Sequence, residues 1–268
     1  MAELSMNETT TFRWSFDEDV TNYAAAEIRA MGAWRQKISD FGQQKAVELL
    51  DDSGMKVSHV LWAGGFTGSD GRSYRESVED AREALHAAAE LKAESLVVYS
   101  GARAGHTFNH ARRLFQGALK ELVPVAEKLG VNMAVEPMHP GCATDWTFLT
   151  SVDDALELLA SVDSPVVKMV LDTYHLGQDE DFAERIGEIT PHLALVQLGD
   201  ALGPPTGEQN RCRLGDGVVP LSEIVAALKS SGYDGYYDVE LLGEEVETFD
   251  YQSLLEHAKD AFAKLLGE

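Results

Sequence analysis

The stretch VLDTYH at residues 170–175 leads from an apolar run directly into an acidic side chain and then a histidine. A continuous apolar run of this kind is typical of a strand buried on both faces, as the strands of a parallel sheet are. An acidic residue just after the run lies where the strand meets a loop. The stretch therefore predicts a buried parallel strand with an oxygen-bearing side chain at its carboxyl end.

Three further stretches place an oxygen-bearing side chain at the end of an apolar run: VEP at 135–137, VQLGD at 196–200 and VEL at 239–241. Carboxyl ends of neighbouring parallel strands lie at one edge of a sheet, so we expect these side chains to converge. Oxygen-only sites suit Mg²⁺ or Mn²⁺ better than Zn²⁺. The predicted metal ligands are Glu136, Asp172, Gln197 and Glu240.

Apolar runs alternate with amphipathic segments along the rest of the chain. The expected strands are Thr11–Phe16, Glu27–Met31, Val57–Trp62, Ser95–Tyr99, Asn132–Glu136, Val167–Leu171, Ala194–Leu198 and Gly235–Glu240. The expected helices are Val20–Ala26, Ile38–Asp51, Ser77–Leu91, Asn109–Lys128, Val152–Leu159, Phe182–Ile189, Leu221–Ser231 and Tyr251–Leu266. Eight strands alternating with helices predict a (β/α)8 TIM barrel in the α/β class, formed by one domain.

A doubly wound open sheet is the alternative fold. Such a sheet usually carries a glycine-rich phosphate loop after its first strand. Residues 15–19 read SFDED, which would repel a phosphate, so the barrel is favoured. We expect the barrel to span residues 11–268 and residues 1–10 to form a disordered or extended tail.

The composition excludes several classes of partner. The 268 residues carry a formal net charge of -23, which opposes binding to nucleic acid and to anionic membranes. No apolar stretch approaches the roughly 20 residues of a membrane helix, and residues 1–10 lack the features of a signal peptide. Cys142 and Cys212 have no CxxC spacing, which indicates two free thiols in a cytoplasmic protein.

Charged and aromatic residues near the strand ends are candidates for substrate binding. His175 follows Asp172 by three residues and can bind substrate or transfer a proton, while Arg211 can hold a substrate oxygen. Four further side chains can shape the pocket, although ordinary barrel packing explains each equally well: Trp14, Trp62, His106 and Trp146. Asp238 is the alternative to Glu240 as a ligand, and His59 is expected in the core.

Together these motifs resemble the xylose isomerase-like barrel superfamily, within which the chain is similar to the sugar phosphate isomerase/epimerase group. This group includes ketose 3-epimerases, hydroxypyruvate isomerase and inosose dehydratase. The resemblance implies that Glu136, Asp172, Gln197 and Glu240 hold one Mn²⁺ or Mg²⁺. It also implies that His175 and Arg211 bind the substrate, and that the chain can form a homodimer.

The activity implied by the resemblance is isomerisation or epimerisation of a keto sugar through an enediolate. Glu136 and Glu240 would act as acid and base, and His175 is a further candidate catalytic residue. The alternative is a lyase, dehydratase or C-glycoside-cleaving enzyme that acts on an oxidised sugar or inosose. The motif EPMHP supports this alternative, because His139 resembles a candidate base and substrate-binding residue in such a subgroup.

Abasic-site endonucleases with three zinc ions belong to the same superfamily. Their seventh loop carries extra His and Asp ligands, whereas this chain has Gln209 and Arg211 at those positions. These residues and the negative net charge disfavour a DNA-repair function. A small-molecule sugar is the expected partner, and the absence of a dedicated phosphate loop favours a sugar without phosphate.

Overall fold

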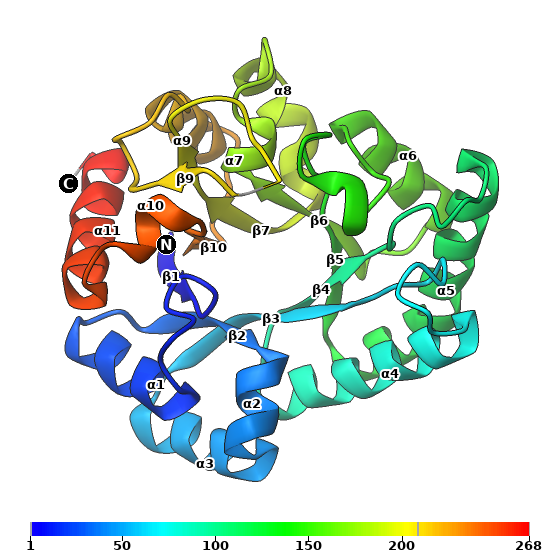
Figure 1. Cartoon of the computed structure of the whole chain (residues 1–268), viewed down its shortest axis with the longest axis horizontal. Coiled ribbons are helices and arrows are strands. Elements are labelled where there is room, and N and C mark those ends of the chain that lie inside the picture. The colour runs from blue at the N-terminus through cyan, green and yellow to red at the C-terminus, as the bar shows by residue number, and fades with distance from the viewer. Residues whose placement is uncertain (1, 208, 268) are drawn as a thin grey trace.

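The computed structural model of the chain describes residues 2–207 and 209–267. Eight parallel strands close into a barrel in the order β1-β10-β7-β6-β5-β4-β3-β2, with the helices around it (Figure 1). The barrel strands are β1 (Glu3–Asn7), β2 (Ala30–Trp34), β3 (Lys56–Gly64), β4 (Ser95–Tyr99), β5 (Asn132–Val135), β6 (Val167–Asp172), β7 (Leu193–Leu198) and β10 (Tyr236–Val239). The predicted single-domain TIM barrel is confirmed.

The helices form the outer layer. They are α1 (Phe16–Ala25), α2 (Arg35–Phe41), α3 (Gln43–Ser53), α4 (Tyr74–Glu90), α5 (Phe108–Leu129), α6 (Val152–Val162), α7 (Thr173–Leu176), α8 (Phe182–Ile189), α9 (Leu221–Ser230), α10 (Glu244–Glu247) and α11 (Tyr251–Leu266). In the loop after β7, the short strands β8 (Asp200–Ala201) and β9 (Arg211–Cys212) pair antiparallel. None of the helices in the described residues is long and apolar enough to cross a membrane.

The predicted strands from residue 57 onward match β3 to β7 and β10 within one or two residues. The first predicted strand is wrong, and the second is displaced along the chain. Residues 3–7 form β1 between β10 and β2, so the barrel includes half of the segment expected as a tail. The segment Thr11–Phe16 is instead a turn followed by α1, because Ser15 and Glu18 form a capping box that begins the helix.

The second strand begins three residues later than predicted. Ile28 N–H donates to the Tyr23 carbonyl at 2.9 Å, which continues the end of α1, and Glu27 has a positive φ of 62°. These two features delay β2 to Ala30–Trp34. The predicted helix Ile38–Asp51 is divided into α2 and α3 at Gly42, whose φ is 102°.

The packing of the core follows from two periodicities. On α5, buried residues recur three or four apart and face the barrel: Ala111, Phe115, Ala118, Leu122 and Ala126. On the strands, side chains alternate between the helices and the barrel interior. Ala134, Val170 and Leu195 belong to a buried cluster separate from the one that packs under the helices. Residues two positions further along each strand therefore face the interior as well.

Candidate metal and substrate site

The alternation of side chains places the four predicted ligands at the carboxyl end of the barrel. Glu136 follows Ala134 by two residues, Asp172 follows Val170, and Gln197 follows Leu195. Asp172 and Gln197 are register partners across β6 and β7. Together with Glu240, just after β10, and His175 on α7, these residues form what we call the carboxylate cluster. Within it, Glu136, Asp172 and His175 have ligand atoms within 4.8 Å of one another.

Glu136 is 2% exposed and sits at the centre of this cluster. Its Oε2 accepts a hydrogen bond of 2.7 Å from the Tyr99 hydroxyl at the end of β4. Burial and the nearby charges of Glu240 and Asp172 raise the pKa of Glu136 well above its ordinary value. A carboxyl group with a raised pKa is suited to proton transfer near neutral pH.

Asp172 is fixed by the guanidinium group of Arg211. Arg211 Nη2 and Nη1 lie 2.8 and 3.3 Å from the two carboxylate oxygens, and the Tyr174 N–H donates to Oδ1 at 2.8 Å. Although burial opposes the guanidinium charge, Asp172 and Glu240 raise the pKa of Arg211. A Cβ added at Gly199 would lie 2.4 Å from Arg211 Nη1, so glycine in the QLGD motif is required for this approach.

His175 lies between the two carboxylates. Its Nε2 is 3.7 Å from Glu136 Oε1 and 3.8 Å from Asp172 Oδ2. Burial lowers the pKa of His175 to about 4, so the imidazole is neutral at physiological pH. A neutral imidazole can accept a hydrogen bond, transfer a proton or ligate a cation through Nε2.

Glu240 is the remaining acidic member of the cluster and lies beside Arg211. Its Oε2 lies 4.0 Å from Arg211 Nη2, and Thr9 Oγ1 donates to its Oε1 at 3.4 Å. Burial raises the pKa of Glu240 to about 7, while Arg211 opposes this shift. Asp238, the alternative ligand, has both oxygens engaged by Ser5 and Asn7 at 2.7 and 2.9 Å. The open carboxylate on this strand is therefore Glu240.

Gln197 tests whether the cluster fits a metal ion. The side chain is fully buried, and its amide makes no hydrogen bond within 3.5 Å to the described residues, although it lies near enough to Glu240 to help lower the pKa of that carboxyl. A buried polar group without a partner costs about 1–3 kcal/mol and is rare in folded proteins. An amide oxygen beside three acidic side chains is the donor set that a hard divalent cation takes, so the residues fit such an ion.

A cavity of about 320 Å³ opens from the cluster towards solvent. Glu136, His175, Arg211 and Glu240 contribute to its floor. Apolar side chains form much of its wall: Phe12, Trp34, Leu61, Trp62, Tyr99, Met138, Trp146 and Leu242. Polar floors with apolar walls are typical of sites for small molecules. We call this space the inner cavity.

The other predicted substrate residues lie in different places. His139 is close enough to help lower the pKa of His175, while its own Nδ1 accepts a 3.1 Å hydrogen bond from the Gly141 N–H. Trp14 does not reach the inner cavity, because it packs edge-on against Tyr251 at 5.0 Å. His106 is also outside it, with its Nε2 3.2 Å from the Thr67 carbonyl. His59 is fully buried, as predicted for a core residue.

Several residues at the inner cavity were not predicted from the sequence, among them Trp34, Tyr99 and Thr9. Trp34 ends β2 and Tyr99 ends β4, so both occupy strand ends that should attract attention in a TIM barrel. Trp34 was missed because the second strand was expected to end at Met31. Thr9 follows β1, which was not predicted as a strand.

A family model described as xylose isomerase-like TIM barrel matches residues 21–264 of the chain. This chain belongs to that family. The match covers most of the barrel, from α1 to α11, and agrees with the closed order of the strands. The resemblance predicted from the strand-end motifs is confirmed.

Two curated relatives differ in how much of the chain they match. L-ribulose-5-phosphate 3-epimerase UlaE of Escherichia coli O157:H7 is 29% identical over 140 residues, which are 52% of this chain and 46% of the epimerase. The chain thus matches about half the length of that relative. Inosose isomerase of Halalkalibacterium halodurans is 22% identical over 254 residues, which cover 92% of this chain and 88% of the isomerase.

Two solved structures show the same barrel. Protein SMc04130 from Sinorhizobium meliloti 1021 is 26% identical, with a TM-score of 0.90 and 98% of both chains covered. A structure of IOLI protein with a bound zinc atom has a TM-score of 0.86 over 99% of this chain and 98% of its own. At 18% identity, the second likeness establishes the fold alone.

Proposed function

We propose that this family member is a divalent-metal-dependent isomerase or epimerase of a keto sugar, acting through an enediolate. The observation that carries the proposal is the carboxylate cluster. Glu136 and Glu240 are buried in one cavity with raised pKa values, and beside them the amide of Gln197 has no partner among the described residues. The relatives named as an epimerase and an inosose isomerase support the same reaction class.

The predicted ligands of the ion are Glu136, Asp172, Gln197 and Glu240; His175 has a nitrogen near the same point but is assigned to the substrate. A bound divalent cation would polarise the substrate carbonyl and stabilise developing negative charge. The oxygen-rich donor set favours Mn²⁺ or Mg²⁺. The zinc held by the IOLI protein makes Zn²⁺ the metal to compare with them.

Proton transfer is assigned to the two glutamates. One glutamate removes the proton from the carbon next to the carbonyl, and the other returns a proton, on the opposite face in an epimerisation. The Tyr99 hydroxyl holds Glu136 in position through its 2.7 Å hydrogen bond. Since burial raises the pKa of Glu240 to about 7, that group can exchange a proton near neutral pH.

Substrate orientation is assigned to His175 and Arg211. His175 presents Nε2 to the space between Glu136 and Asp172, where a sugar hydroxyl can donate to it. Arg211 holds Asp172 and also donates to the Glu240 carbonyl at 3.2 Å, so it stabilises both ends of the cluster. His139 lies near His175 and remains a candidate for contact with the outer part of the sugar.

The experiment is metal analysis followed by incubation of keto sugars with the Mn²⁺-loaded protein in D₂O. Incorporation of deuterium beside the carbonyl, with an isomer or epimer as product, is the expected result. Loss of exchange after chelation and its return with Mn²⁺ would establish the dependence on metal. The proposal is wrong if the loaded protein leaves every sugar of the panel without deuterium and unchanged.

A lyase is the second candidate, favoured by the proximity of His139 to His175. Elimination begins with the same removal of a proton beside a carbonyl, and then expels water or an aglycone from the neighbouring carbon. An oxidised sugar or inosose would be the substrate. In the same assay an unsaturated product would identify this reaction, whereas an epimer would identify the first.

A further inference from the structure

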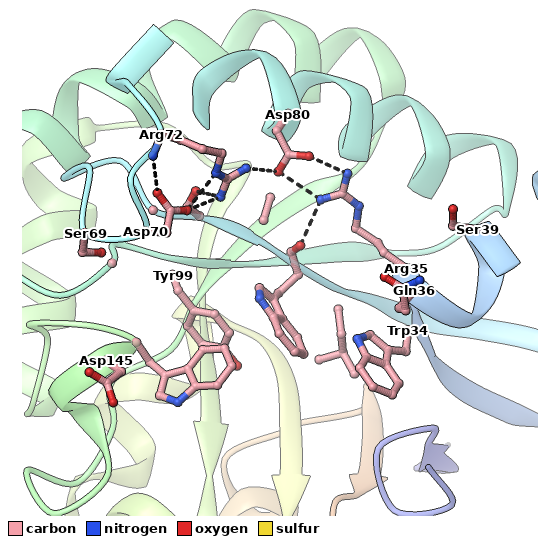
Figure 2. Close-up of a pocket in the computed structure, with 17 residues that line it drawn as sticks. Trp34, Arg35, Gln36, Ser39, Ser69, Asp70, Arg72, Asp80, Tyr99 and Asp145 are labelled. Carbon is pink, nitrogen blue, oxygen red and sulfur yellow. Dashed lines mark hydrogen bonds and ion pairs between the residues drawn. The ribbon is translucent and has the colours of Figure 1, made fainter. Parts of the chain in front are cut away.

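A second cavity of about 510 Å³ adjoins the inner cavity on the side of α2 and α4. The two spaces share a wall of Trp34, Leu61, Trp62, Tyr99 and Trp146. Figure 2 shows this second space, which we call the outer cavity, with Arg35, Asp80 and Arg72 on one side of it. The two cavities therefore lie side by side at the carboxyl end of the barrel.

The shared wall is a continuous aromatic surface. Trp62 stacks on Trp34 with ring centres 6.3 Å apart and meets Trp146 edge-on at 5.0 Å. Tyr99 lies 6.0 Å from Trp62 and also hydrogen-bonds to Glu136 at 2.7 Å. Trp146 is 37% exposed, although large apolar side chains are usually buried. Exposed aromatic faces beside a catalytic cavity are suited to pack against a ring of the substrate.

The opposite side of the outer cavity carries charged side chains that form ion pairs with one another. Asp80 accepts from Arg35 Nη2 at 2.8 Å, and Arg72 Nη1 lies 3.0 Å from the same carboxylate (Figure 2). Arg72 Nε donates to Asp70 at 2.8 Å. Both guanidinium groups are also tied to the backbone, Arg35 to the Trp62 carbonyl at 3.1 Å and Arg72 to the Gly64 carbonyl at 2.9 Å.

This pairing decides which chemical groups the outer cavity accepts. Its two arginines face Asp70 and Asp80, and Asp145 adds a third carboxylate, so the charged groups of the lining sum to about one negative charge. In the inner cavity, Arg211 is likewise engaged by Asp172. A phosphate or carboxylate on the substrate would therefore meet no free cation among the described lining residues, whereas neutral hydroxyl groups would find many hydrogen-bonding partners.

The shape of the outer cavity depends on glycine. Gly65 has a φ of +81°, and a Cβ there would lie 2.3 Å from Asp70 Oδ2. Gly101 has a φ of +84°, and a Cβ there would lie 2.8 Å from Ser69 Oγ. Side chains at either position would displace the paired groups and narrow the space. The outer cavity is thus formed by the local structure and is larger than the inner cavity.

We propose that the outer cavity binds a second, neutral, hydroxyl-bearing ring of the substrate, joined to the keto sugar that occupies the inner cavity. This inference rests on the proposed function and specifies its substrate class: a two-ring sugar without phosphate. The aromatic wall contacts the C–H face of the second ring, and the paired arginines and aspartates bond to its hydroxyl groups.

Matched sugars test this class in the Mn²⁺-loaded protein. Fructose, its glucosyl derivative isomaltulose and fructose 6-phosphate share one ketose and differ only in the substituent on one oxygen. Trehalulose and fructose 1-phosphate form a second pair on another oxygen. Calorimetry should show a glucosyl derivative binding at least about tenfold tighter than fructose, and both phosphates binding more weakly than fructose.

The variant Ser69→Trp places a large side chain in the outer cavity without touching the carboxylate cluster. It should reduce the ratio between the affinities for the glucosyl derivative and for fructose about tenfold, and leave the affinity for fructose unchanged. Ser230→Trp is the matched control, because Ser230 is exposed at the end of α9 and lines neither cavity. Equal losses for fructose and the glucosyl derivative in Ser69→Trp would overturn the proposal.

The variant Asp80→Asn tests the electrostatic part and does not depend on filling space. Removing the carboxylate leaves Arg35 without a charged side-chain partner and Arg72 with Asp70 alone, so an anion gains a free cation. The loss of binding affinity of fructose 6-phosphate relative to fructose should become about tenfold smaller. An unchanged penalty would show that the pairing of the arginines does not set the specificity.

Binding and deuterium exchange separate this inference from the proposed function. Tight binding of a glucosyl derivative without deuterium exchange would contradict the proposed enolate chemistry and leave the two-ring site standing. Two results would overturn the two-ring site and leave the proposed chemistry standing. One is deuterium exchange with fructose while the glucosyl derivatives neither bind more tightly nor exchange faster than fructose. The other is tighter binding of the sugar phosphates than of fructose.

Discussion

Two buried polar clusters lie near the carboxyl end of this barrel, and they differ in how fully the fold satisfies them. In the first, Lys37 donates to the carbonyls of Glu8 and Thr11 at 3.2 and 3.0 Å and pairs with Asp19. Thr11 Oγ1 donates to Asp19 at 2.6 Å. In the carboxylate cluster, by contrast, Gln197 and one nitrogen of His175 have no partner in the described chain.

The difference shows what each cluster does. Three contacts for one ammonium group match the donors that a lysine offers, so the Lys37 ammonium needs no ligand, even though Glu8 Oε1 near Asp19 has no partner among the described residues. It links the loop after β1 to α1 and α2. The carboxylate cluster keeps acidic groups and an amide close together at a cost in stability, which a bound cation and substrate would repay. The saturated ammonium of Lys37 thus belongs to the scaffold, whereas the unpartnered amide of Gln197 lies beside the acidic side chains of the candidate site.

The largest expected effect comes from Glu136→Gln. Removing the proposed proton-transfer group should lower turnover of the proposed keto-sugar substrate by about 10²–10⁴-fold. The metal-free variant should be at least as stable as the parent, because a neutral amide replaces a buried carboxyl group. Turnover comes from the exchange assay and stability from thermal unfolding. Near-normal turnover would show that Glu136 is not the acid or base, and Glu240→Gln makes the same test of its partner.

Lys37→Met should affect stability in the opposite way. The change leaves Asp19 buried without its cation, which costs about 3–5 kcal/mol of the free energy of unfolding. Urea denaturation measures this loss, and Lys45→Met, at an exposed position, is the control with an expected change within about 0.5 kcal/mol. A loss no larger than that of the control would remove the distinction between the two clusters.

His59 sharpens the comparison, because its Nε2 is also unpartnered among the described residues although it does not line the inner cavity. Burial lowers the pKa of His59 from the ordinary 6.5 to about 3. The unfolded chain therefore binds a proton that the folded chain does not, and stability falls as the pH drops below about 6.5. The loss is about 1.4 kcal/mol per pH unit, or about 2 kcal/mol at pH 5.

The measurement is the free energy of unfolding of the parent and of His59→Asn from pH 7 to pH 5. Asp238, whose Oδ2 lies 3.8 Å from His59 Nε2, is present in both proteins, and groups farther away contribute equally to both, so the difference reports on the His59 site. The parent should lose more stability than the variant as the pH falls. Parallel curves would mean that His59 does not resist protonation in the folded barrel.

Gln197→Met gives the smallest expected change in stability. The apolar side chain has a similar volume and removes an unpartnered amide, so the metal-free variant should gain up to about 1 kcal/mol. Its affinity for Mn²⁺ should fall, because one oxygen ligand is lost. Thermal unfolding with and without Mn²⁺ separates the two effects. Destabilisation of the metal-free variant would show that the amide has a structural role.

Much of the fold and of the cluster could be predicted because both depend on local periodicity. An apolar run ending in Glu136, Asp172 or Glu240 defines a strand, its direction and its inward face. By contrast, β1 is a five-residue strand in which Ser5 and Asn7 are polar and donate hydrogen bonds to Asp238. The hydrophobic pattern of this strand is therefore weak. Its position depends on pairing with β10, which lies more than two hundred residues away.

The cavity walls were predicted less well, because they depend on contacts between loops. Trp62 and Trp146 were candidates, but nothing local shows that they meet edge-on. The pairing of Arg35 with Asp80 joins α2 to α4, and that of Arg211 with Asp172 joins β9 to β6. Such pairs depend on tertiary structure. The sequence alone therefore does not show that these arginines are already paired with carboxylates.

The most direct test of the account is a titration of Mn²⁺ into metal-free protein, in which electron paramagnetic resonance measures the bound and free ion. The account predicts one tightly bound Mn²⁺ per chain, weaker binding in Gln197→Met and Glu136→Gln, and unchanged binding in the exposed control Ser230→Trp. Binding that is absent in the parent, or equal in all four proteins, would contradict the assignment of the carboxylate cluster as the metal site.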